Sequence, residues 1–404
     1  MNPSLPLQGP HLRVRFLALD AFLHAHQELW RPKPFTTPTL PWEARHPDLA
    51  QWLRARDLAA AEADHARPER LTGAPAPYPA LAAEAAALTA LAPFPRQPTP
   101  SLPSRFNVDV PGRKWQQIDA FAASLRFTDP VHHWLDWCAG KGHLGRRLAH
   151  DGHPLRCLEQ DPDLVREGQR LSDRLGLEAE HLQQDVLAED AAQRLDAHHT
   201  PVALHACGDL HLRLMRLADA AGCARLALAP CCYNRTEASA YQPLSQAGRE
   251  AALALDREDL RLAISETVTA GARVRRQRDR SMAHRLGFDL LQRHLRSEDH
   301  YLPTPSLPGT WLERPFAEQA VALANGRLDL PATLDWAHWE TAGWRRLAEV
   351  RNLELLRGLF RRPLELWLVL DRALYLEDRG YRVQVGPFCD QNLTPRNLLI
   401  VAER

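Results

Sequence analysis

The chain has 404 residues and a net charge of zero, because 50 basic residues balance 50 acidic ones. Hydrophobic residues make up 45% and charged residues 25%, which is typical of a globular protein in water. A zero net charge excludes binding to a polyanion through overall charge, so contact with nucleic acid needs a local basic surface. No apolar run approaches the roughly 20 residues of a membrane span, and the N-terminal residues do not follow the pattern of a secretory signal.

The seven cysteines are scattered and odd in number, unlike a disulfide framework. Reduced thiols are typical of proteins in the cytoplasm, which is the expected location. We expect no membrane association and no obligate protein partner.

Residues 1–104 are expected to form a helical N-terminal region that ends in a Pro- and Ala-rich linker. Apolar residues recur at helical spacing over 15–30, and a second amphipathic segment covers 48–66. The linker, from about residue 68, contains one further helix over 80–91.

Residues 105–234 are predicted to form the core, because strand and helix patterns alternate there as they do in a parallel sheet covered by helices. Asp161 or Asp163 is expected to cap the third of these helices. The predicted strands cover 131–138, 154–161, 180–187, 201–210 and 225–233, and the predicted helices cover 116–125, 142–152, 161–176 and 211–222.

The alternation stops over 235–340, where helical and Pro-rich pieces predict an insertion after the fifth strand. Residues 341–404 are expected to return to the core with a helix near 364–378 and two closing strands. The joint between these strands is too short for a crossover helix, so they should be antiparallel. The predicted fold is α/β and Rossmann-like, with a mostly parallel sheet that ends in an antiparallel hairpin, as in class I methyltransferases.

The strongest motif is DWCAGKGHLG, from Asp136 to Gly145, at a turn from strand to helix. Glycines let the backbone approach a ligand closely, and the helix that follows offers free N–H groups. The motif also satisfies the dinucleotide pattern G-x-G-x-x-G, which alone is weak evidence.

Three acids follow successive predicted strands and should line one crevice. Asp136 precedes the glycines, where a carboxylate can hold the amino-acid part of S-adenosylmethionine. Glu159 ends the next strand, where an acid binds ribose hydroxyls, and Asp161 competes with it for that role. Asp185 ends the third strand and can accept from an adenine amino group. The alternative is that these acids cap the helices that follow.

Two motifs after the fourth and fifth strands contain candidate catalytic residues. His205 and Asp209, in HACGDL, are placed to take a proton from an attacking hydroxyl or nitrogen. Tyr233 and Asn234, in PCCYN, are placed to stack on and hydrogen-bond a planar target group. The alternatives are that Asp209 caps the next helix, that His205 is a packed histidine, and that Tyr233 is a buried aromatic residue.

No metal site is predicted from His205, Cys207, Cys231 and Cys232, because no C-x₂-C pair is present and adjacent cysteines chelate one ion awkwardly. Cys207 or Cys231 as a nucleophile and inert buried thiols both remain open. The basic run over 273–280 suits contact with phosphates or the solvated face of a helix.

Together, DWCAGKGHLG, LHACGDL, APCCYN and TPRNLLIVA resemble the family around methyltransferase-like protein twenty-five. That family includes the methyltransferase portion of glutathione-S-transferase-C-terminal-domain-containing proteins. The first three motifs are also similar to those of tRNA 2′-O-methyltransferases of the Trm-thirteen type. The resemblance covers about 114–229, the CCYN element and the last strands. Tyr233-Asn234 stands where those tRNA enzymes have a double histidine, and their zinc-finger-like segments are missing, so tRNA 2′-O-methylation does not carry over.

The resemblance implies an S-adenosylmethionine-dependent methyltransferase, and we expect RNA as its substrate. Alternatives are a protein or small-molecule acceptor, a non-catalytic cofactor-binding scaffold, and an NAD-dependent dehydrogenase. The predicted cofactor-binding residues are Lys114, Asp136, Cys138, Ala139, Gly140, Lys141, Gly142, Glu159, Gln160, Asp185 and Val186.

Overall fold

The computed structural model describes residues 5–265 and 271–404. Its contacts divide the chain into two units that interleave along the sequence. Most of the N-terminal region and most of the stretch predicted as an insertion therefore belong to the same unit. Of the described residues, the first unit contains those up to 25, 88–265 and 362–404, and the second contains 26–87 and 271–361.

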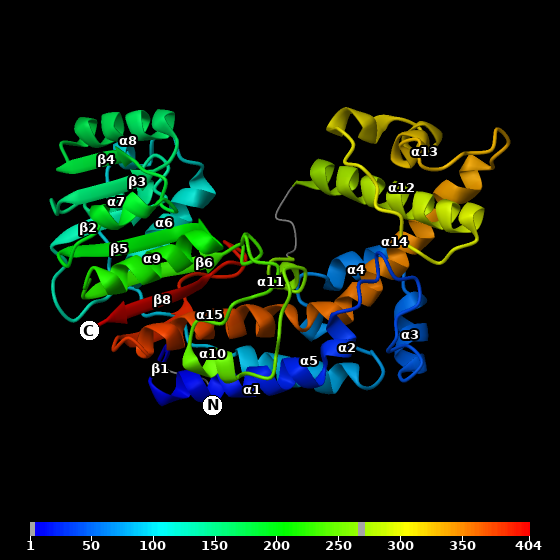
Figure 1. Cartoon of the computed structure of the whole chain (residues 1–404), viewed down its shortest axis with the longest axis horizontal. Coiled ribbons are helices and arrows are strands. Elements are labelled where there is room, and N and C mark those ends of the chain that lie inside the picture. The colour runs from blue at the N-terminus through cyan, green and yellow to red at the C-terminus, as the bar shows by residue number, and fades with distance from the viewer. Residues whose placement is uncertain (1–4, 266–270) are drawn as a thin grey trace. The chain divides into compact units, whose positions relative to one another are not determined.

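The first unit is built on one eight-stranded sheet. Its strands are β1 (Leu7–Gln8), β2 (His133–Trp137), β3 (Leu155–Glu159), β4 (Ala179–Gln183), β5 (His199–Cys207), β6 (Arg225–Cys231), β7 (Arg382–Pro387) and β8 (Leu398–Glu403). Their order across the sheet is β4-β3-β2-β5-β6-β8-β7-β1 (Figure 1). The neighbours from β4 to β6 are parallel, whereas β8 runs antiparallel to both β6 and β7.

The predicted Rossmann-like sheet and its antiparallel closing hairpin are confirmed. The central strands are almost fully buried, in agreement with the near-continuous apolar runs of a sheet that is covered on both faces. The two-residue edge strand β1 was not predicted, because so short a segment leaves no pattern in the sequence.

Helices connect the parallel strands and pack on them. Helix α7 contacts β2 and β3, α8 contacts β3 and β4, and α9 contacts β5 and β6. The carboxyl ends of these strands therefore open toward one edge, where a ligand binds in folds of this kind. The helices of this unit are α1 (Pro10–Ala25), α6 (Gly112–Ser124), α7 (His143–Leu148), α8 (Pro162–Leu175), α9 (Asp209–Ala220), α10 (Gln246–Glu250), α11 (Leu260–Ala263) and α15 (Arg361–Glu377), with 3₁₀ turns at Ser104–Asn107 and Glu189–Arg194.

Helix α15 is the most deeply buried helix of this unit, with an unbroken run of buried residues from Pro363 to Leu376. Trp367 packs against Phe16 of α1 with ring centroids 5.0 Å apart. Arg372 of the same helix donates to His211 of α9, with Nε to Nε2 at 2.8 Å. This helix therefore ties α1 and α9 together behind the sheet.

The second unit is helical in its described residues. The segment 48–66, predicted as one amphipathic stretch, forms two helices because the Asp57 side chain accepts from Ala60 N at 2.7 Å and starts α4 afresh. Phe288, Phe316 and Leu323 form a small core with their neighbours. Its helices are α2 (Gln27–Trp30), α3 (Pro47–Arg54), α4 (Leu58–Asp64), most of α5 (Tyr78–Thr89), α12 (Ala272–Arg296), α13 (Phe316–Ala324) and α14 (Trp336–Gly358), with 3₁₀ turns at Pro68–Arg70 and Gly309–Glu313.

Among the described helices, none combines the length and the hydropathy that a membrane span requires.

Candidate active site

The chain reverses direction after β2 through a loop that leads into α7. Cys138, Gly140 and Gly142 all have positive φ, at 56°, 57° and 72°. Ala139 N donates to Leu158 O of β3 at 2.9 Å, and Gly142 N donates to Ala139 O at 2.8 Å. These bonds hold the loop against the carboxyl edge of the sheet.

The two central glycines of this loop face different surroundings. A Cβ on Gly140 would meet no atom within 4 Å. A Cβ on Gly142 would lie 2.5 Å from Cε1 of His181 and 3.0 Å from the sulfur of Cys157. Gly142 is therefore required by packing, whereas the space beside Gly140 can receive a ligand.

Asp136 lies at the end of β2 and is 2% exposed. Its Oδ2 accepts from Gly145 N in the first turns of α7 at 2.8 Å. Burial raises its pKa to about 7, while the Gly145 N–H and the charge of Lys114 act in the opposite direction. A cationic ligand group beside Asp136 would stabilise the ionised form, as the ammonium of an amino acid does.

Glu159, at the end of β3, also supports the loop. Its carboxylate accepts from Gly140 N at 2.8 Å and from Asp161 N at 3.0 Å. Asp161 caps α8 by accepting from Asp163 N at 2.8 Å, so the cap is Asp161 and not Asp163. Glu159 is therefore better placed for a ligand at the loop than Asp161. The carbonyl of Gln160 accepts from the Gln183 side chain at 3.4 Å.

The third predicted acid lies in the turn after β4. Asp185 is exposed, and its Oδ1 accepts from Leu187 N at 2.9 Å. Val186 is buried. Since this bond uses only one of its two carboxylate oxygens, the exposed Asp185 keeps an acceptor for a ligand.

The two lysines near the loop behave differently. Lys141 forms an ion pair with Glu167 of α8, with Nζ to Oε2 at 2.5 Å. Lys114 is exposed on α6, and its charge lowers the pKa values of both Asp136 and His205. Lys114 therefore acts electrostatically on both of these residues. Burial raises the pKa of the Cys138 thiol to about 12.

His205 lies where β5 is irregular, with φ at 70° and a register shift between Leu204 and Cys207. Its Nε2 lies 2.8 Å from Oε1 of Gln117. The other end of that amide, Nε2, donates to Leu393 O at 3.2 Å, which fixes the amide oxygen toward the histidine. Because an amide oxygen only accepts, His205 Nε2 carries the proton and Nδ1 has the free lone pair.

The environment keeps this imidazole neutral. Burial lowers the pKa of His205, and the charge of Lys114 lowers it further. Gln117, which orients the ring, was missed in the sequence because only its position one helical turn after Lys114 pointed to the site.

Asp209 begins α9, but the residue before it is the N-cap. Its Oδ2 accepts from Glu237 N at 3.0 Å, and its own N–H donates to Arg235 O at 3.0 Å. Asp209 therefore joins the loops after β5 and β6.

Tyr233 and Asn234 follow β6. Tyr233 is 2% exposed, and its ring lies under the guanidinium of Arg372, with Cζ 5.0 Å from the ring centroid. Its hydroxyl donates to Pro230 O at 3.4 Å, so the ring packs inside the unit and not toward solvent. Asn234 differs, because its buried Oδ1 has no hydrogen-bond partner within residues 5–265 and 271–404. A buried acceptor of this kind costs free energy until a donor reaches it.

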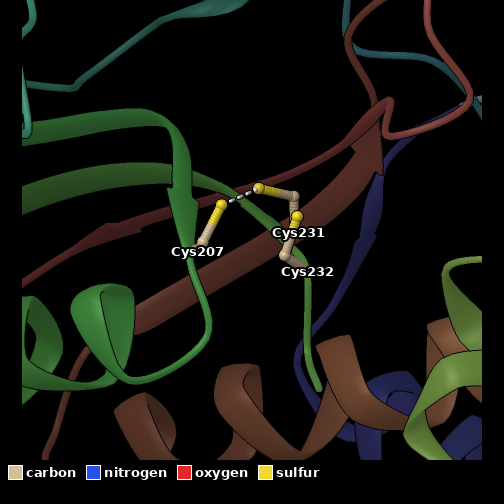
Figure 2. A group of neighbouring side chains, drawn as sticks. All are labelled: Cys207, Cys231 and Cys232. Atoms are coloured by element: carbon tan, nitrogen blue, oxygen red, sulfur yellow. Dashed lines mark hydrogen bonds between the residues drawn. The ribbon is translucent and has the colours of Figure 1, made fainter. Parts of the chain in front are cut away.

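Three cysteine side chains meet at the ends of β5 and β6 (Figure 2). The sulfurs of Cys207, Cys231 and Cys232 all lie within 4.8 Å of one another, and those of Cys207 and Cys231 are 3.5 Å apart. Hydrogen bonds from the other two thiols lower the pKa of Cys232, whereas the pKa values of Cys207 and Cys231 are raised.

Comparison with known proteins agrees with this geometry. Residues 113–239 match the family described as "Methyltransferase domain". No curated protein matches the chain. The solved structures that are similar to it include magnesium protoporphyrin IX methyltransferase from Synechocystis PCC 6803 with bound SAH, at 19% sequence identity and a TM-score of 0.25. That match covers 31% of this chain and 63% of the other, so the chain spans less than two thirds of that protein.

The solved structure is too distant to inform the substrate. The family match covers the glycine loop, the acids after β2, β3 and β4, and both motifs after β5 and β6. The strand order and the antiparallel β8 complete the class I arrangement. Residues 113–239 therefore match a methyltransferase domain, and they lie in a sheet with the Rossmann-like fold.

Proposed function

We propose that the chain transfers a methyl group from S-adenosylmethionine to RNA, with the donor held at the loop after β2. The observation that carries the proposal is the pairing of a buried carboxylate, Asp136, with open space beside Gly140. The carboxylate suits the ammonium of the donor, and the bare glycine backbone lets the donor lie against the loop. Glu159 and Asp185, at the ends of the next two strands, suit the ribose and the adenine amino group.

His205 is the residue we propose as proton acceptor. When bound, S-adenosylmethionine supplies an electrophilic methyl group that an acceptor oxygen or nitrogen attacks. The neutral ring offers Nδ1 for the proton of that acceptor, because Nε2 is committed to Gln117. Asp209 is less suited to this role, since one of its oxygens already receives the Glu237 N–H.

Asn234 is proposed to hold the acceptor. Its buried Oδ1 needs a donor, and exocyclic amino groups or hydroxyls of a nucleotide supply one. Tyr233 has a packing role in this proposal, because its buried ring lies under Arg372.

The basic run of α12 supports RNA as the acceptor. Arg273, Arg275 and Arg276 are exposed in its first turns, although the net charge of the chain is zero. Closely spaced arginines on a helix bind successive phosphates.

The decisive experiment gives the purified chain methyl-labelled donor and separate pools of RNA, protein and small metabolites. We expect label in RNA. Label in another pool would overturn the RNA assignment but keep the methyltransferase, whereas failure to bind S-adenosylhomocysteine in calorimetry, with binding of NADH, would overturn both.

Variants separate the two parts of the proposal. Asp136→Ala should lower S-adenosylhomocysteine affinity by more than about 100-fold, since a buried charged partner is lost. Asp161→Ala, at the exposed cap nearby, is the matched control and should change affinity little. Arg273→Glu with Arg276→Glu should weaken RNA binding and its salt dependence, while the affinity for S-adenosylhomocysteine stays the same.

A further inference from the structure

The three thiols at the ends of β5 and β6 are brought together by two irregularities of the backbone. Cys231 and Cys232 are adjacent, and in a regular strand their side chains would point to opposite faces. Cys232 instead has φ at 46°, and Figure 2 shows both side chains near that of Cys207. His205, two residues before Cys207, also has positive φ beside the register shift of β5.

Positive φ at residues with a side chain is uncommon and is concentrated at functional sites. In the part of the chain that is described, six residues other than glycine have it; one of them, Cys232, belongs to this cluster and another, His205, lies two residues before Cys207. The sequence spacing argued against a metal site because adjacent cysteines chelate one ion awkwardly. The turn at Cys232 removes that objection.

The sulfur spacing suits a tetrahedral metal ion. With Zn–S bonds of about 2.3 Å, two sulfurs on one tetrahedral zinc lie about 3.7–3.8 Å apart. The Cys207 and Cys231 sulfurs are 3.5 Å apart, and all three lie within 4.8 Å of one another.

Burial gives the cluster a closed side and an open side. Cys231 is 3% exposed, whereas Cys207 and Cys232 are only partly buried. Three protein ligands with a fourth position open to the surroundings are the arrangement of catalytic zinc sites, whereas structural sites have four protein ligands.

We propose that Cys207, Cys231 and Cys232 bind one thiophilic divalent cation, Zn²⁺, through their three sulfurs and leave its fourth position open. Binding displaces the thiol protons to solvent, and no redox change occurs. The proposal does not depend on RNA as the acceptor, because it concerns the residues of the cluster alone.

The first test uses the whole chain. Protein purified under reducing conditions and freed of metal is titrated with Co²⁺, then with Zn²⁺. We expect one ion per chain, absorption bands of tetrahedral cobalt with thiolate ligands, and loss of these bands when zinc replaces cobalt. Absence of thiolate-to-cobalt absorption in the folded wild type would overturn the proposal without any variant.

The second test uses matched serine variants. Cys207→Ser and Cys232→Ser should each lower Zn²⁺ affinity by more than about 100-fold, since even loss of an outer partner of a ligand costs about 10–100-fold. Cys223→Ser is the control, because Cys223 is a more deeply buried free cysteine whose sulfur bonds Asp196 O outside the cluster. Circular dichroism of each variant separates loss of a ligand from loss of the fold.

Two results would count against the site. Zinc binding that survives Cys207→Ser and Cys232→Ser together would place the metal elsewhere. A Cys207–Cys231 disulfide in the protein as isolated, with no metal taken up after reduction, would make the cluster a redox pair. Calorimetry with S-adenosylhomocysteine on the same samples shows whether the donor site is intact, so failure of one proposal is distinguished from failure of the other.

Discussion

The loop after β2 and the ends of β5 and β6 both turn through positive φ, but they do so with different residues. The first relies mainly on glycines, at Gly140 and Gly142, whereas the second uses His205 and Cys232. Glycine adopts this conformation without steric strain, whereas a residue with a side chain is strained in it. The difference fits our proposal, in which the donor lies against the bare backbone at Gly140 and side chains act where the acceptor reacts.

The largest effect on the rate of methyl transfer is expected from a substitution of His205. His205→Gly removes the proposed base and should lower the rate of methyl transfer by about 10²–10⁴-fold. Relief of backbone strain, about 1–3 kcal/mol, should offset the lost packing, so the free energy of unfolding should change little. Initial rates and urea unfolding measure the two quantities. Loss of stability without loss of rate would reverse our distinction between the two regions.

A second variant, Gln117→Glu, leaves the imidazole of His205 in place and tests whether it acts as a base. The imidazole must be neutral to accept a proton, so activity should fall as pH drops through the lowered pKa of His205. Gln117→Glu places a carboxylate at Nε2 and raises that pKa, so activity should be lost at a higher pH than in the wild type. An unchanged pH profile would remove His205 as the titrating base.

Gly142→Ala is expected to have the largest effect on stability. Its Cβ would lie 2.5 Å from His181 Cε1, and φ is 72°. Overpacking and backbone strain together should cost about 2–4 kcal/mol. Urea unfolding measures the fall in the free energy of unfolding. A smaller fall for Gly142→Ala than for Gly140→Ala would contradict the packing argument.

Protonation of His181, the neighbour of Gly142, should make the free energy of unfolding depend on pH. Burial lowers its pKa to about 4 in the folded chain, from about 6.5 when unfolded. The folded state therefore binds fewer protons between these values, and stability present above about pH 6.5 is lost as pH falls toward 4. The loss should be about 2–3 kcal/mol. His181→Gln should flatten this slope, and the exposed His132→Gln should not.

The smallest effect on stability and on ligand affinity is expected from a substitution of Gly140. Gly140→Ala meets no atom within 4 Å, so it should cost only the strain of positive φ, about 1–2 kcal/mol. Its methyl group points into the space proposed for the donor and should lower S-adenosylhomocysteine affinity about tenfold, or about 1.4 kcal/mol. Unchanged affinity in calorimetry would mean that the donor lies elsewhere.

Much of the fold followed from local patterns. Apolar runs near 131–138 and 225–233 predicted β2 and β6, and the short joint before β8 predicted its antiparallel direction. The pairing of residues 26–87 with 271–361 did not follow, because neither segment carries a local signal for so distant a partner.

The candidate site, too, was predicted only where it depends on local sequence. The glycine turn after β2 and the position of Asp136 before it were predicted, because glycines at this spacing indicate a turn; their role in binding the donor stays a prediction. The burial of Tyr233 under Arg372, the bond from Gln117 to His205 and the meeting of the three thiols depend on contacts between distant segments. In the thiol cluster, one backbone angle at Cys232 reverses the conclusion drawn from spacing alone.

The interleaving of the two units also sets an order of events during synthesis. Residues 26–87 leave the ribosome early, but the partner segment that completes their unit begins only after residue 265. At about 5–20 residues per second, the early helices wait on the order of ten seconds or more for that segment. During this interval the faces of α2, α3 and α4 that later pack against α14 remain uncovered.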